Sequence, residues 1–139
     1  MYTYEYPRAA LTVDALVFTQ TESEIHLLLI QRGHEPFLNK WALPGGFVNL
    51  DETLEHACIR ELEEETGLKI SSMQQFRAYD AIDRDPRHRT ISIVFSAQLT
   101  EQKNVKGGDD ASRAKWFSIS HLPELAFDHA QIINDFFRS

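Results

Sequence analysis

Three glutamates, Glu61, Glu64 and Glu65, stand at positions i, i+3 and i+4 of a segment whose pattern predicts a helix. On a helix these spacings bring Cβ atoms to about 5 to 6 Å, so the carboxylates repel one another, and near the C-terminus they also oppose the macrodipole. Charge runs usually mark a solvated face. A bound Mg²⁺ or Mn²⁺ would resolve the conflict, because hard divalent ions favour carboxylates and substrate phosphates. We therefore predict half of a metal site.

The surrounding segment, residues 46–68, reads GFVNLDETLEHACIRELEEETGL. It satisfies the pattern G-x5-E-x7-R-E-U-x-E-E-x-G-U, where U is aliphatic, through Gly46, Glu52, Arg60, Glu61, Leu62, Glu64, Glu65, Gly67 and Leu68. Seven fixed residues coincide by chance on the order of 10⁻⁸ of the time at background frequencies. The segment resembles the signature box of the Nudix hydrolase family at every fixed position. The resemblance implies a metal-dependent hydrolase that cuts a diphosphate linked to another group, most often a nucleoside.

The resemblance also implies the metal ligands, which are Glu61, Glu64, Glu65 and the Gly45 carbonyl, with Mg²⁺ or Mn²⁺ as the cofactor. Gly45 and Gly46 lack Cβ atoms, so backbone can approach the ion and the substrate phosphate closely. Gly46 is accordingly a candidate for substrate binding.

The general base is open at this point. We favour Glu64, and in relatives the base can also come from a later loop, which here offers Glu101, Asp109 and Asp110. Arg60 can orient a carboxylate of the cluster, although an ordinary helix salt bridge explains it as well. Glu52 is expected to support the ligands or to act as an outer ligand.

The substrate is suggested by weaker motifs. Arg84, Arg87 and Arg89 belong to an R-D-P-R-H-R segment that resembles the arginine-rich loop of Nudix ADP-ribose pyrophosphatases, and three guanidinium groups could hold a diphosphate. A solvated basic hairpin is the alternative. Residues 125–129, LAFDH, resemble a segment of Nudix domains tied to NAD metabolism. Both resemblances indicate ADP-ribose, cleaved to AMP and ribose 5-phosphate. Arg32 is a further candidate for substrate binding.

Two other functions compete with this one. The first is a non-catalytic ADP-ribose sensor like the ligand domain of Nudix transcriptional regulators. We disfavour it because the acidic box is intact and because 139 residues leave no room for a winged helix. The second is a nucleoside triphosphate sanitising pyrophosphatase. Aromatic residues near the expected cleft, Phe37, Trp41 and Tyr79, could stack on adenine, but such residues are core more often. The histidines His34, His88 and His129 are expected to be structural or exposed.

Composition limits the class of protein. The 139 residues, with 42% hydrophobic and 25% charged, suit one globular domain spanning residues 1–139. A net charge of −7 argues against nucleic-acid partners, which require basic surface. The absence of a long apolar run or signal peptide predicts a cytoplasmic protein without a membrane partner. Cys58 is the lone cysteine and suggests packing. Alternating Tyr2, Tyr4 and Tyr6 could add an edge strand or join a homodimer interface.

These residues require a scaffold of strands and helices. Asp51 is expected to cap a helix over residues 52–66 that ends at Gly67, with Leu54, Cys58 and Leu62 facing the core. A second helix should open at Asp128. Extended segments are predicted at 9–18, 25–31, 41–48, 72–82 and 91–99, and a loop at 101–113. The pattern predicts an α/β fold with helices on both faces of the sheet, and the resemblance implies the Nudix α/β/α sandwich with a mixed sheet.

Overall fold

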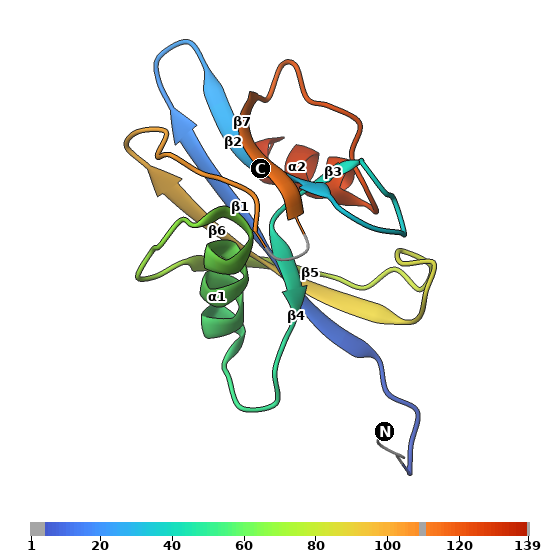
Figure 1. Ribbon diagram of the computed structural model, residues 1–139. Helices are drawn as coiled ribbons and strands as arrows, with labels where there is room; N and C mark the ends of the chain where they lie inside the picture. Colours follow the sequence, from blue (N-terminus) through green and yellow to red (C-terminus); the bar gives the residue numbers. More distant parts are fainter. Residues whose placement is uncertain (1–4, 109–110, 139) are drawn as a thin grey trace.

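The computed structural model describes residues 5–108 and 111–138, and its centre is a seven-stranded sheet (Figure 1). Five strands follow the order β3-β2-β1-β6-β5, while β4 pairs with β1 and β7 pairs with β2. The strands are β1 (Ala10–Gln20), β2 (Ile25–Arg32), β3 (Trp41–Ala42), β4 (Gly45–Phe47), β5 (Gln74–Tyr79), β6 (Thr90–Leu99) and β7 (Ala111–Ser118). The helices are α1 (Leu54–Thr66) and α2 (His129–Arg138).

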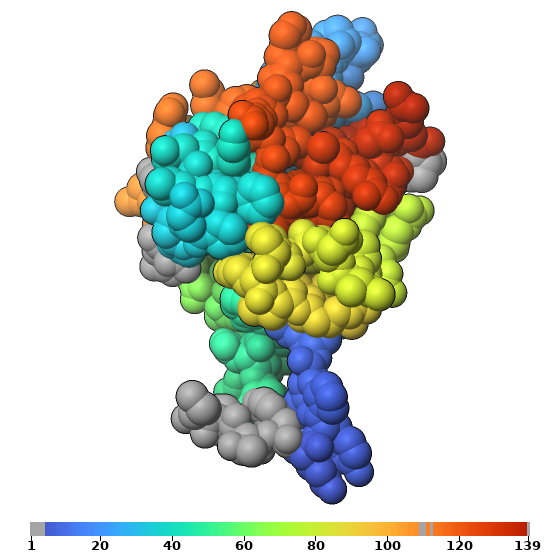
Figure 2. Space-filling model, turned by 90° about the vertical axis from the view of Figure 1, so that its right-hand side faces the viewer, coloured from blue at the N-terminus to red at the C-terminus, as the bar shows by residue number. Residues whose placement is uncertain are grey.

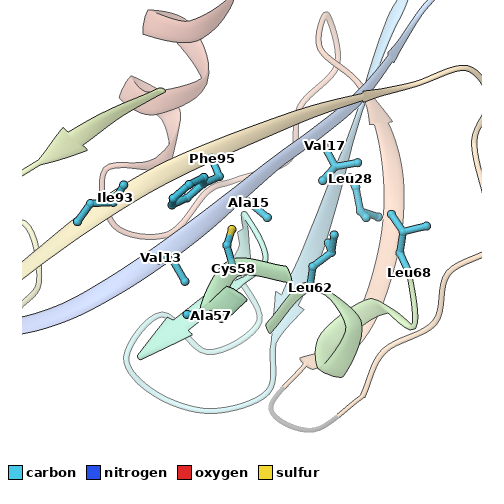
Figure 3. Packing of buried hydrophobic residues seen from close by; sticks show 10 residues of the cluster. All are labelled: Val13, Ala15, Val17, Leu28, Ala57, Cys58, Leu62, Leu68, Ile93 and Phe95. Atoms are coloured by element: carbon cyan, nitrogen blue, oxygen red, sulfur yellow. The ribbon is translucent and has the colours of Figure 1, made fainter. Parts of the chain in front are cut away.

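The sheet is mixed, because β1 runs parallel to β6 and antiparallel to β2 and β4. Side chains of β1 alternate between two cores, as successive residues of a strand must. Val13, Ala15 and Val17 join a core cluster with α1, including Cys58 and Leu62 (Figure 3). The other cluster combines residues of β1, β2 and β6 with α2, and contains Leu16, Phe18, Leu27, Leu29, Val94, Ile132 and Ile133. One helix therefore covers each face, which confirms the α/β/α sandwich.

The start of α1 corrects a sequence prediction. Thr53, not Asp51, caps the helix, because its backbone is extended and its hydroxyl accepts a hydrogen bond from the His56 N–H at 3.2 Å. The helix begins at Leu54, so Glu52 lies outside it. At the other end Gly67 adopts a left-handed conformation with φ of 77°, as predicted. The cap fixes the rotation of α1 and hence the directions of its glutamates.

Other boundaries shift by a few residues. β5 covers Gln74–Tyr79 only, within the predicted 72–82, and β7 begins at Ala111 inside the segment predicted as a loop. Asp128 does open α2, and its carboxylate binds Arg84. Tyr2 and Tyr4, the basis of the predicted edge strand, lie outside the described residues. In the described ranges, neither helix has the length and apolar character needed to cross a membrane.

Candidate active site

Arg60 lies at the centre of the acidic cluster on α1. Its guanidinium donates to Glu52 at 2.6 and 2.9 Å, to Glu61 at 2.9 Å, to Glu64 at 3.1 Å and to the Phe47 carbonyl at 3.1 Å. Hydrogen bonding to Arg60 is the main cause that lowers the pKa of Glu52 to about 2, and the pKa of Arg60 is raised in turn. In this structure the repulsion among the glutamates is thus offset by an arginine of the same helix.

Two glutamates of α1 lie directly against the glycine pair of β4. Glu65 is buried and accepts a hydrogen bond from the Gly45 N–H at 2.8 Å. The carboxyl group of Glu61 lies against Gly46, since a Cβ there would be 2.5 Å from the Glu61 Cδ. A Cβ on Gly45 would lie 2.1 Å from the Val13 carbonyl oxygen of β1. Glycine is therefore required at both positions, because α1 and β1 pack too closely against β4 to leave room for a Cβ atom.

The donors gathered here have the chemistry of a divalent cation site. Glu61 and Glu65 place carboxylates beside successive residues of β4, and Glu64 shares Arg60 with Glu61. Oxygen donors of this kind suit Mg²⁺ and Mn²⁺. Within residues 5–108 and 111–138, no three acidic, histidine or cysteine side chains converge closely enough to ligate one ion. The donor types fit a hard divalent ion, and Arg60 donates to two of the three glutamates, Glu61 and Glu64.

One candidate for the general base, Glu64, lies near the end of α1. The Glu64 side chain is 39% exposed, so it can contact solvent while it pairs with Arg60. The loop after β6 passes this helix end, because a Cβ on Gly108 would be 2.5 Å from the Glu64 carbonyl oxygen. Glu101 is exposed and pairs with a lysine of the same loop at 3.1 Å. Asp109 and Asp110 lie outside the described residues.

A cleft opens beside β4 and brings distant segments together. It is lined by residues of β1, β2, β3, β4, β6, α1, the start of α2 and the segments that connect them: Thr12, Asp14, Ile30, Arg32, His34, Ala42, Leu43, Gly45, Gly46, Phe47, Glu65, Arg84, Asp85, Arg87, Thr90, Phe127 and His129. Figure 2 shows the β5–β6 loop, in yellow, against the red segment that contains α2. Three further box residues, Glu52, Arg60 and Glu64, line a separate hollow along α1.

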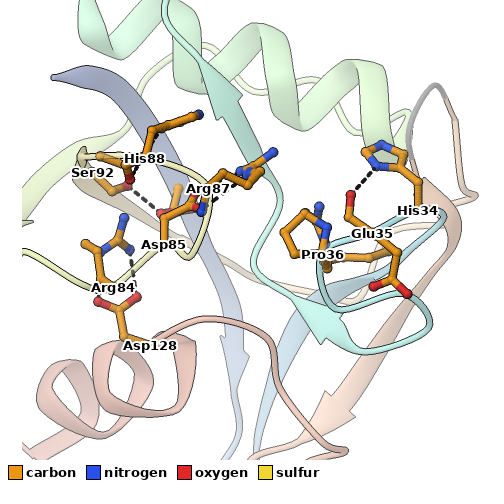
Figure 4. Close-up of polar contacts among 12 residues, drawn as sticks. His34, Glu35, Pro36, Arg84, Asp85, Arg87, His88, Ser92 and Asp128 are labelled. Carbon is orange, nitrogen blue, oxygen red and sulfur yellow. Dashed lines mark hydrogen bonds and ion pairs between the residues drawn. The ribbon is translucent and has the colours of Figure 1, made fainter. Parts of the chain in front are cut away.

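Two of the predicted substrate-binding arginines lie over aromatic rings of this cleft. Arg87 is about one third exposed, and its guanidinium carbon is 5.8 Å from the ring centres of both Phe47 and Phe127. Asp85 holds Arg87 through two hydrogen bonds of 2.8 and 3.1 Å (Figure 4). Arg32 lies 5.0 Å from the Phe127 ring centre and donates to the Pro36 carbonyl at 2.7 Å. The cleft therefore has two cationic groups on aromatic walls.

The other two arginines are placed differently. The Arg84 side chain is only 4% exposed and forms a two-pronged ion pair with Asp128, at 2.6 and 2.9 Å (Figure 4). Arg89 does not line the cleft and donates to the carbonyl oxygens of Asp80 and Ala81 at 2.6 and 3.3 Å. Arg84 thus lines the cleft as a buried partner of Asp128, Arg89 binds backbone within the β5–β6 loop, and Arg32 and Arg87 lie on the aromatic walls of the cleft.

Sequence reasoning missed a buried polar network on the cleft floor. Asp14 accepts a hydrogen bond of 2.5 Å from Ser92, and the His129 Nε2 lies 3.6 Å from the Asp14 carboxylate. The His129 Nδ1 accepts a hydrogen bond from the Leu43 N–H at 3.0 Å, and burial lowers the pKa of His129 from its ordinary value, which favours the neutral ring. The available signal was an aspartate within the apolar run of β1.

The aromatic residues divide between core and cleft. Trp41 and Tyr79 are buried in the core cluster on the α2 side, which agrees with the expectation that such residues are core more often. Phe37 packs on Phe127 with ring centres 4.8 Å apart. Phe47, which was not predicted as a site residue, is 45% exposed beside Arg87. The exposed aromatic surface of the cleft thus comes from Phe47 and Phe127.

Comparison with known proteins agrees with this geometry. A family model described as the NUDIX domain matches residues 9–136. The chain is 44% identical over 133 residues to the ADP-ribose pyrophosphatase of Methanocaldococcus jannaschii, a match that covers 96% of this chain and 76% of that protein. It is 30% identical over 137 residues to the ADPR responsive transcriptional repressor NtrR of Acinetobacter baylyi, covering 96% of this chain and 55% of the repressor.

Two solved structures share the fold over nearly the whole chain. A MutT/nudix family protein from Enterococcus faecalis superposes with a TM-score of 0.90 at 34% identity, covering 99% of this chain and 64% of that one. The NUDIX domain of Shewanella oneidensis NrtR, complexed with ADP ribose, gives 0.88 at 32% identity, covering 96% and 89%. This chain therefore spans about half of the repressor and about two thirds of the Enterococcus protein. On the family match and these relatives, the chain belongs to the Nudix hydrolase family.

Proposed function

We propose that this protein hydrolyses ADP-ribose to AMP and ribose 5-phosphate with the help of a divalent metal ion. The observation that carries the proposal is the cleft itself, in which Gly45, Gly46 and Glu65 of the box segment share one space with Arg32 and Arg87. Guanidinium groups bind phosphate oxygens in pairs, so the two arginines suit a diphosphate. The similarity to an ADP-ribose pyrophosphatase over 76% of its length supports the choice of substrate.

Nudix hydrolases generally use divalent metal ions, and we propose Glu61, Glu64, Glu65 and the Gly45 carbonyl as the ligands. A bound Mg²⁺ or Mn²⁺ would neutralise charge on the diphosphate and lower the pKa of a water molecule. The glycine pair supports this assignment because its lack of Cβ atoms lets the Glu61 carboxylate reach the β4 backbone. We assign to Arg60 the orientation of Glu61 and Glu64, and to Glu52 the anchoring of Arg60.

The reaction consumes one water molecule. The water oxygen forms a bond to one phosphorus, the bond between that phosphorus and the bridging oxygen breaks, and the bridging oxygen leaves with the other phosphate. Glu64 accepts the proton of the attacking water in our proposal, because it is partly exposed and lies beside Glu61. Glu101, Asp109 and Asp110 remain the alternatives for this role. Gly46 would receive a phosphate oxygen close to its backbone.

A substrate panel tests the proposal. The protein is incubated with Mg²⁺ and with ADP-ribose, NADH, a diadenosine polyphosphate or oxidised dGTP, and products are separated by ion-exchange chromatography. We expect the highest kcat/KM for ADP-ribose, with AMP and ribose 5-phosphate in equal amounts. EDTA should abolish turnover, and added Mg²⁺ should restore it. Activity that persists after chelation would show that hydrolysis does not need a divalent metal ion.

The same panel distinguishes the competing functions. Tight ADP-ribose binding without any turnover would show a sensor, and the similarities to the NUDIX domain of Shewanella oneidensis NrtR complexed with ADP ribose and to the ADPR responsive repressor of Acinetobacter baylyi make this the second candidate. Preference for a nucleoside triphosphate would show a sanitising enzyme, the class of a putative 8-oxo-dGTP diphosphatase from Bacillus subtilis that is 30% identical over 126 residues. Four properties stay predictions from the sequence. They are a cytoplasmic location, a homodimer, the lack of nucleic-acid partners and a single domain over residues 1–139.

A further inference from the structure

Two adjacent residues at the start of α2 reach different walls of the cleft. Asp128 binds Arg84 of the β5–β6 loop, and His129 binds the backbone of Leu43, which directly follows β3. These contacts connect the end of the chain to its middle and to the segment that leads into β4.

The Asp128 contact fixes the loop that carries Arg87. The Arg84–Asp128 pair is two-pronged, and both side chains are mostly buried, with 4% and 16% exposed. Removing one partner of such a pair leaves an uncompensated buried charge, so the loop would have to move to solvate it. Within the loop, Asp85 holds Arg87 over the rings of Phe47 and Phe127. The Arg84–Asp128 pair and the Asp85–Arg87 pair thus belong to the same loop, one residue apart.

The His129 contact fixes the segment that carries the glycine pair. Its Nδ1 accepts from the Leu43 N–H at 3.0 Å, so in the neutral ring the proton is on Nε2, which faces the Asp14 carboxylate at 3.6 Å. Two residues later, the Gly45 N–H donates to Glu65 of α1. The segment is therefore held from both faces of the sheet, by α2 through Leu43 and by α1 through Gly45.

We propose that Asp128 and His129 are positioning residues that align the substrate-binding loop with the catalytic strand. Asp128 acts through Arg84 to place Arg87, and His129 acts through Leu43 to place Gly45 and Gly46. Arg84 is then a structural partner of Asp128, not a ligand of the diphosphate. The proposal rests on the proposed function for its kinetic readouts, whereas its binding and exchange readouts are independent of turnover.

A double-mutant cycle tests the Asp128 arm. Asp128→Asn, Arg84→Met and the combined variant are compared for kcat and KM, for the calorimetric Kd of ADP-ribose with EDTA present, and for Tm. Because each single change frees the same loop, we expect KM and Kd to rise about tenfold with kcat within about threefold of wild type. The combined variant, in which neither member of the pair is charged, should bind no worse than the weaker single variant. Additive losses of binding, with Arg84→Met the larger, would show direct contact with the diphosphate and overturn this arm.

Two substitutions of His129 separate its contacts. An asparagine oxygen occupies the position of Nδ1 and keeps the acceptor for Leu43, whereas a glutamine oxygen occupies the position of Nε2 and loses it. We expect His129→Gln to lower kcat about tenfold with little change in KM, and His129→Asn to stay within about threefold. Hydrogen exchange of the Leu43 amide should accelerate in His129→Gln only. Equal kcat in the two variants, or slow Leu43 exchange in both, would overturn this arm.

Failure of the proposed function is recognised separately. If wild-type protein turns over none of the panel, the reaction is excluded, yet the Leu43 exchange rates and the ADP-ribose Kd values still decide the alignment. If wild-type protein is active and neither substitution pair behaves as expected, the alignment is wrong and the reaction stands.

Discussion

The acidic helix and the arginine-bearing wall of the cleft are built in opposite ways. The charged groups of α1 come from one short segment, and Arg60 joins three of its carboxylates. The opposite wall combines Arg32 of β2, Arg87 of the β5–β6 loop and Phe127 before α2. The first depends on helical spacing, and the second depends on the complete sheet. Changes in the helix should therefore affect kcat, and changes in the wall should affect KM.

The largest effect is expected on the helix. Glu64→Gln removes a proposed metal ligand and base, so kcat should fall at least about 10²-fold while Tm changes little. The matched control is Glu63→Gln. Glu63 is exposed on the same turn, and its ion pair with a surface lysine is long, at 3.8 Å. Steady-state rates with ADP-ribose provide the measurement. A rate near wild type for Glu64→Gln would show that Glu64 is not the general base and would favour the loop acids for that role.

The glycine pair tests whether the helix and the strand act as one unit. Gly46→Ala places a Cβ 2.5 Å from the end of the Glu61 side chain, which can move, so we expect about a tenfold loss of kcat with little loss of stability. Gly45→Ala meets the fixed Val13 carbonyl at 2.1 Å, so we expect a destabilisation of about 1 to 3 kcal/mol. Thermal unfolding and kinetics are compared for both variants. Similar losses of Tm in Gly45→Ala and Gly46→Ala would contradict the expected difference between a fixed and a movable neighbour.

The wall of the cleft is tested with a pair of arginines from the same loop. Arg87→Lys loses the planar fork that can bind two phosphate oxygens, so KM for ADP-ribose should rise about tenfold with kcat nearly unchanged. Arg89→Lys is the control, because Arg89 donates to backbone carbonyls outside the cleft. We expect its KM to stay within about twofold of wild type. A larger KM change for Arg89→Lys would place the diphosphate elsewhere.

The smallest effect concerns the helix cap. Thr53→Ala removes the hydroxyl that accepts from the His56 N–H, and we expect a destabilisation of about 1 kcal/mol in urea unfolding. Asp51→Ala should change stability by less than about 0.5 kcal/mol, because Thr53 holds the cap. The reverse order of the two effects would restore Asp51 as the cap of the helix in solution.

The sequence predicted what depends on spacing within one element. The helical period predicts the course of α1 up to Gly67 and the inward stripe of Cys58 and Leu62. It also predicts the pairing of Arg60 with Glu64 at i, i+4. The cap was misplaced by two residues because aspartate and threonine are both good caps. Only the folded chain shows that Arg60 binds Glu52 as well as Glu61 and Glu64.

Contacts between distant elements could not be read from the sequence. Arg84 and Arg87 look equivalent in the R-D-P-R motif, yet in the cleft Arg84 is buried against Asp128 while Arg87 is partly exposed. The partnership of Asp14 with His129 joins β1 to α2 and has no local signature beyond a charge in an apolar strand. Pairings of this kind require the register of the sheet, which a linear pattern does not specify.

The parallel pairing of β1 with β6 has a consequence for how the protein folds. Ala10 pairs with Thr90, so most of the chain must be present before these two central strands can join. Pairings between residues this far apart in sequence are slow to form, because a long loop must be closed first. Helix α1 can form early from local interactions, but Asp14 meets Ser92 only when β6 arrives. The cleft should therefore be among the last parts of the molecule to be completed during folding.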